Sequence, residues 1–138
     1  MQFQKLLIML AICVLVVLPV YAQTVKPATI QPTSAASGEE MYKEYCAVCH
    51  GLDGMGKGPA APAMTKPPTD LTAMARKNNG AFPATRVMES IRGDLYTPAH
   101  CSKDMPVWGR LFSSLDSNTG LVQLRLSNLT NHIKTMQK

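Results

Sequence analysis

The stretch Cys46-Ala-Val-Cys49-His50 decides how the rest of the chain is interpreted. Its two cysteines lie three residues apart, and a histidine follows the second one directly. On a helix, residues three apart share a face, so both thiols can react with one ligand while the next residue lies beneath it. A thiol pair followed by an imidazole fits three kinds of site: a redox dithiol, a zinc site or the attachment point of a covalent haem.

Covalent attachment of a c-type haem fits this motif best. The two thiols can add to the vinyl groups of the haem, and His50 then becomes the proximal ligand of the iron. A thioredoxin-like dithiol needs a strand leading into it, and no strand pattern precedes Cys46. A zinc site needs a second ligand pair, which His100 and Cys101 could supply, so that alternative stays open. We predict one haem c, attached through Cys46 and Cys49.

The first residues are typical of a secretory signal. A basic residue, an apolar run over residues 6–18 and a small residue at Ala22 follow one another. Pro19 interrupts the run, which falls short of the roughly 20 apolar residues that span a bilayer. We therefore predict a signal peptide over residues 1–22, cleaved after Ala22, with export to the periplasm and no stable membrane span afterwards. Cys101 would remain as an unpaired thiol whose role the sequence leaves open.

Length and charge restrict the remaining possibilities. The chain has 138 residues, enough for one domain, and a formal net charge of +5. Its lysines and arginines are scattered singly rather than gathered in runs. Scattered charges indicate a solvated surface, so we predict no nucleic-acid partner.

A change of composition at Ser37 predicts a domain boundary. Residues 23–36 are rich in Pro, Thr and Ala without an apolar period, which predicts a flexible linker. Ser37-Gly-Glu-Glu40 then fits a capping box, so we predict a helix from Gly38 to Cys49. The haem domain would cover residues 37–138.

The segments that follow predict a long loop and three further helices. Glycines and prolines fill residues 51–68, which predicts a loop that wraps the cofactor. Such a loop can bring a carbonyl to the second ring nitrogen of His50, and Pro59 is our first candidate. We predict short helices from Thr69 or Asp70 to Asn79 and from Pro83 to Gly93.

The C-terminal segment predicts the longest helix. Apolar residues recur there with helical period, and Arg125, Asn128 and Lys134 lie off the apolar stripe. The stripe consists of Val122, Leu126, Leu129, Ile133 and Met136. Because neither terminal helix can bury its stripe alone, we expect this stripe to pack against Met41 or Tyr42. No segment alternates as a strand does, so the predicted fold class is all-α.

Together with the attachment motif, three phrases resemble the class I cytochromes c. They are Gly51-Leu-Asp-Gly54-Met-Gly56, Asp70-Leu-Thr72 and Asp104-Met-Pro-Val-Trp-Gly109. The resemblance covers about residues 37–138 and implies the fold of that family, with N- and C-terminal helices packed together beside one covalent haem. It also implies a methionine far downstream as the second axial ligand. Cys101 has no counterpart in the family pattern.

Met105 has the best setting for that ligand. Pro106 keeps the chain around it extended, and Val107 and Trp108 can shield its sulfur from water. Met64 in the predicted wrapping loop is the rival, and the remaining methionines of the domain lie in predicted helices or too close to the motif. A histidine ligand, from His100 or His132, is a weaker alternative.

Iron held by His50 and Met105 has no vacancy for a substrate, which predicts a carrier of single electrons and not an enzyme. Its partners would be redox proteins, whose identity as donor or acceptor the sequence does not give. A haem-bearing subunit of a larger oxidoreductase, a haem enzyme or sensor with an open iron site, and a structural subunit with a redox-inert haem are the alternatives.

Overall fold

A computed structural model describes residues 30–94 and 105–138. The predicted signal peptide, residues 23–29 of the predicted linker, His100 and Cys101 lie outside the described residues. The described part contains helices and no strand, which confirms the all-α fold class. Its elements are α2 (Gly38–Met41), η1 (Tyr42–Cys46), α3 (Ala47–His50), η2 (Ala61–Ala63), η3 (Leu71–Ala73), η4 (Arg76–Asn78), α4 (Ala84–Arg92), α5 (Trp108–Leu115) and α6 (Thr119–Thr135).

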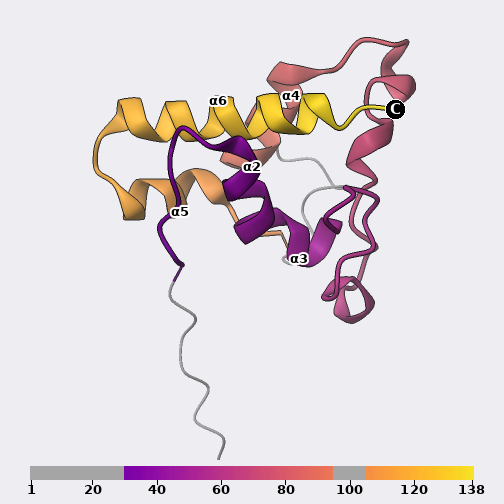
Figure 1. Ribbon diagram of the computed structural model, residues 1–138, viewed down its shortest axis with the longest axis horizontal. Coiled ribbons are helices and arrows are strands. Elements are labelled where there is room, and N and C mark those ends of the chain that lie inside the picture. The colour runs from indigo at the N-terminus through magenta and orange to yellow at the C-terminus, as the bar shows by residue number, and fades with distance from the viewer. Residues whose placement is uncertain (1–29, 95–104) are drawn as a thin grey trace, which may run out of the picture. The chain divides into compact units, whose positions relative to one another are not determined.

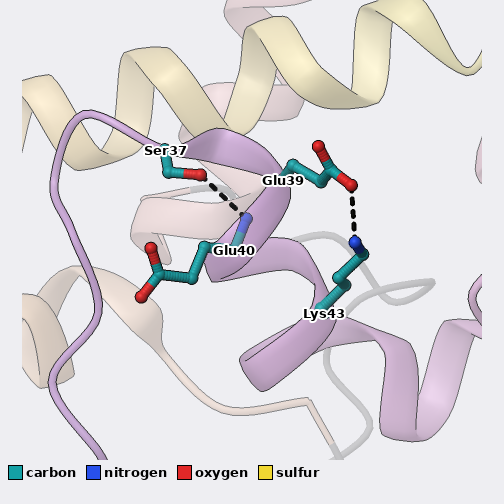
Figure 2. Close-up of polar contacts among 4 residues, drawn as sticks. All are labelled: Ser37, Glu39, Glu40 and Lys43. Carbon is teal, nitrogen blue, oxygen red and sulfur yellow. Dashed lines mark hydrogen bonds and ion pairs between the residues drawn. The ribbon is translucent and has the colours of Figure 1, made fainter.

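The N-terminal helical run starts at the predicted cap. The Ser37 hydroxyl accepts a hydrogen bond from the Glu40 backbone N–H at 3.1 Å (Figure 2). The Glu40 carboxylate does not return to Ser37 as in a full capping box but accepts from the Ser34 N–H at 3.3 Å. Glu39 and Lys43, one turn apart, form a surface ion pair in the same view.

The terminal helices pack against each other, as predicted. Figure 1 shows α2 lying across α6, and the two elements are in contact. On α2 and η1, Met41 and Tyr42 are buried, and on α6 Leu126, Leu129 and Ile133 are buried opposite them. Gly38 permits the close approach, because a Cβ atom there would lie 2.1 Å from the Asn128 carbonyl oxygen.

Arg125 was expected off the apolar stripe but is buried, with only 8% of its surface exposed. The reason is α5, a helix that the sequence analysis did not predict. It contacts α6 and places the fully buried Phe112 ring against the Arg125 guanidinium. The buried face of α6 is therefore wider than the apolar stripe.

Of the two short helices predicted between the loop and the C-terminal segment, one is confirmed and the other is not. α4 begins after Pro83 and ends at Gly93, which has φ +94°, as predicted. The segment after Asp70 is capped as predicted, but it forms the two 3₁₀ turns η3 and η4 instead of one α-helix.

Gln137 explains why no α-helix forms there. Its side-chain amide donates to the Leu71 carbonyl and accepts from the Ala75 N–H, both at 2.8 Å. These two backbone groups are four residues apart and would bond to each other in an α-helix. A side chain from the end of the chain thus replaces a local hydrogen bond.

Candidate haem site

One pocket brings the predicted site residues together. Cys46, Cys49 and His50 line it from the end of the N-terminal helical run, and Met105 lines it from the segment before α5. The space not filled by protein atoms, counted out to the open mouth of the pocket, is about 900 Å³. Its apolar walls include Pro67, Pro68, Leu71, Val87, Trp108 and Ile133.

The two cysteines lie at a change of helix geometry. Residues Tyr42–Cys46 form a π-helical segment, and the α-helix resumes at Ala47. Single π-turns inside α-helices occur often at functional sites, but no feature of the sequence predicted this one. Within the part of the chain that the structure describes, no disulfide joins these two cysteines. Burial, followed by the nearby Cys49, raises the pKa of the Cys46 thiol to about 12, so this thiol is protonated in the bare chain.

The His50 ring is held by a backbone carbonyl. Its Nδ1 lies 3.0 Å from the Thr69 carbonyl oxygen, which can only accept, so Nδ1 carries the proton. This assigns Nε2 as the nitrogen with a lone pair for a metal, the usual arrangement of a ligating histidine. The prediction of the Pro59 carbonyl was wrong.

The loop over residues 51–68 explains why the Thr69 carbonyl, and not the Pro59 carbonyl, lies at His50. In the loop after His50, the N–H groups of Gly58 and Ala60 donate hydrogen bonds to the carbonyls of Cys49 and Val48. The part of the loop that contains Pro59 is therefore bound to the end of helix α3. The later part of the loop, which contains Pro68 and Thr69, passes close to Gly56, where a Cβ atom would be 2.3 Å from the Pro68 carbonyl oxygen. This close passage brings Thr69 to His50.

Three methionines line the pocket: Met64, Met74 and Met105. Met64 was the predicted rival of Met105, whereas Met74 was expected in a helix core and was missed. Met74 is the C-cap residue of the 3₁₀ turn η3 and does not lie inside an α-helix. The structure brings His50 and Met105 into one pocket, and the choice among the sulfurs stays a prediction.

An aromatic cluster forms part of the pocket wall. Trp108 stacks on Tyr45 with ring centroids 5.0 Å apart, and both rings line the pocket. Phe112 packs behind them, 5.8 Å from each ring. Apolar aromatic side chains exclude water from such a site.

These residues fit a covalently attached haem. The pocket offers two thiols for attachment, an imidazole oriented through its other nitrogen, thioether sulfurs and mainly apolar walls. Among the described residues, no group of three or more His, Cys, Asp or Glu side chains is placed to hold a metal ion. The zinc alternative required His100 and Cys101, which lie outside that part of the chain.

Comparison with known proteins supports the same class. Residues 33–93 match the family model described as cytochrome C oxidase, cbb3-type, subunit III. Residues 33–93 thus match a class I-like cytochrome c domain, which confirms the resemblance seen in the sequence for that part of the chain. The match ends at Gly93, before Met105. Comparisons with curated proteins and with solved structures give no match.

Within residues 30–94 and 105–138, none of the helices has the length and hydropathy needed to cross a membrane.

Proposed function

We propose that this chain is a carrier of single electrons, with one haem c attached to Cys46 and Cys49 and its iron ligated by His50 and Met105. The observation that carries the proposal is that all four side chains line one pocket, although Met105 lies far from the motif in sequence. A bound haem would supply a one-electron iron couple.

Each residue has a separate task at this site. The cysteines hold the haem covalently, and the Thr69 carbonyl orients the His50 ring and fixes its tautomer. Met105 offers a soft sulfur, which favours ferrous iron and raises the reduction potential relative to a second histidine. If His50 and Met105 both hold the iron, no position would be left for a substrate, which would separate a carrier from a haem enzyme or sensor.

The covalent attachment can be tested by the intact mass of the exported protein. We expect a chain that begins near Gln23 and carries one haem after mild acid-acetone extraction, which removes non-covalent haem. Replacing Cys46 and Cys49 together by serine should abolish the covalent haem, whereas Cys101→Ser should retain it. A wild-type chain with the mass of the bare polypeptide would refute the attachment, and a mass that retains residues 1–22 would refute the cleavage.

A second candidate function is that of a haem-bearing subunit in a larger oxidoreductase. The family match favours it, because the description of that family names a subunit of an oxidase. The part of the predicted linker that precedes Gln31, whose carbonyl accepts a hydrogen bond from Tyr45, would then connect the haem domain to its complex. Size-exclusion chromatography of a whole-cell extract, solubilised with a mild detergent, distinguishes the two: a carrier elutes at its own size, and a subunit elutes with the complex.

A further inference from the structure

Arg125 is a charged residue in the interior of the domain. It lies on α6, is 8% exposed, and its guanidinium carbon lies 5.9 Å from the centroid of the Phe112 ring. Its Nη1 donates a hydrogen bond to the Thr33 hydroxyl at 3.2 Å. A buried guanidinium normally pairs with a carboxylate, because burying a lone charge costs free energy.

No carboxylate neutralises this charge within the described part of the chain. The ion pairs found there join Lys43 to Glu39 and Arg92 to Asp94. Among the described residues, the buried Nε atom of Arg125 has no hydrogen-bond partner. Because most of the Arg125 side chain is shielded from water, its charge is screened less than that of a surface arginine.

One layer of aromatic rings separates Arg125 from the haem pocket. Phe112, which the guanidinium covers, packs against Tyr45 and Trp108, and both of these rings line the pocket. These rings carry no charge that could oppose the field of Arg125. The ferric haem carries one more positive charge than the ferrous haem, so a nearby cation disfavours oxidation.

We propose that Arg125 raises the reduction potential of the haem by its uncompensated buried charge. This inference rests on the proposed function, because it needs a haem in the pocket. Burial and local charge are among the means by which a protein sets the potential of a haem.

The competing explanation is that Arg125 only fastens the N-terminal segment. Thr33 also donates to the Tyr45 hydroxyl at 3.0 Å, Tyr45 donates to the Gln31 carbonyl at 2.6 Å, and Asn128 binds the Ala35 carbonyl. In that case the charge itself would be irrelevant. Loss of the hydrogen bond would lower stability without moving the potential.

The test changes the charge and the contacts separately. Arg125→Met removes the charge and keeps a long apolar stem, whereas Arg125→Lys keeps the charge and loses the planar guanidinium. Thr33→Asp places a carboxylate at the position that Arg125 Nη1 contacts and so neutralises its charge. Thr33→Asn is the uncharged control of similar size. For each holo-protein, the reduction potential is measured by redox titration, and the absorption spectrum confirms the haem and its ligands.

We expect Arg125→Met and Thr33→Asp to lower the potential, while Arg125→Lys and Thr33→Asn stay close to the wild type. If Arg125→Met fails to fold, the difference in reduction potential between Thr33→Asp and Thr33→Asn is sufficient for the test, since neither of these variants removes the arginine. Equal potentials in Thr33→Asp and Thr33→Asn with unchanged ligand spectra would overturn the role of Arg125 and leave the carrier function intact. A wild-type protein without covalent haem would overturn both proposals.

Discussion

Gly38 is the residue on which the pairing of the terminal helices depends most directly. A Cβ atom there would lie 2.1 Å from the Asn128 carbonyl oxygen and 2.9 Å from the His132 Cβ atom. Because the first of these contacts is with backbone, it can be relieved only by moving a helix. We expect Gly38→Ala to lower the free energy of unfolding by about 3 kcal/mol, the upper end for overpacked sites.

Denaturant unfolding of the holo-protein measures this effect, with Gly120→Ala as the control. Gly120 is exposed in the first turn of α6, and its added Cβ atom would meet only the Asn118 side chain, at 3.1 Å. Alanine is also the better helix former, so the control should be neutral or slightly stabilising. Equal losses in the two variants would show that the helix crossing is not tight at Gly38.

His132 makes stability depend on pH. Burial of its ring, which lies 5.2 Å from the Tyr42 ring, lowers the pKa of His132 below its usual 6.5, with Glu39 opposing and Lys43 adding to the shift. The unfolded chain therefore binds this proton more tightly than the folded domain. We expect stability to fall as the pH drops from 6.5 through the folded pKa, and to regain this contribution above 6.5.

His132→Gln removes this titration and should flatten the pH dependence in that window. Denaturant midpoints at about pH 7.5 and about pH 5.5, compared between the two proteins, isolate the contribution of His132 from that of other groups. An identical pH slope in the variant would mean that His132 is not desolvated in the folded domain.

At the scale of the helices, the stripe on α6 is the main apolar contact surface. Leu129 is fully buried on it, whereas Leu124 on the same helix is 42% exposed. We expect Leu129→Ala to cost about 2 to 5 kcal/mol, as for other buried leucines that leave a cavity. Leu124→Ala should cost much less, and thermal or denaturant unfolding compares the two. A loss for Leu129→Ala no larger than for Leu124→Ala would contradict the observed packing.

The helices that the sequence predicted are those with local signals. Ser37 and Gly93 mark a helix start and a helix end, and the apolar period of α6 is visible along the chain. α5 carried such a signal too, since Trp108, Phe112 and Leu115 follow helical spacing. The spacing is short, because α5 has only eight residues and directly follows the segment that contains Met105.

The remaining elements depend on partners distant in sequence. The 3₁₀ turns after Asp70 form because Gln137 binds the Leu71 carbonyl and the Ala75 N–H, and no local pattern reveals such a contact. The burial of Arg125 has the same kind of cause, because it depends on the Phe112 ring of another helix.

At the scale of the whole molecule, the site residues that could be predicted are those that form a motif of neighbouring residues in the sequence. The attachment motif named two cysteines and a histidine, and all three line the pocket that also contains Met105. The Thr69 carbonyl at His50 was not predictable, because it depends on how the loop over residues 51–68 returns past the helix end. Met74 was missed for a related reason, since its local helix type was wrong.

The absorption spectrum of the ferric protein tests the central claim most directly, because a sulfur-to-iron bond gives a weak far-red band. We predict that the wild type shows this band and that Met105→Ala abolishes it and lowers the reduction potential. Met64→Ala and Met74→Ala should keep the band, since these sulfurs share the pocket without ligating the iron. A band that survives in Met105→Ala and disappears in Met64→Ala or Met74→Ala would contradict the assignment of Met105.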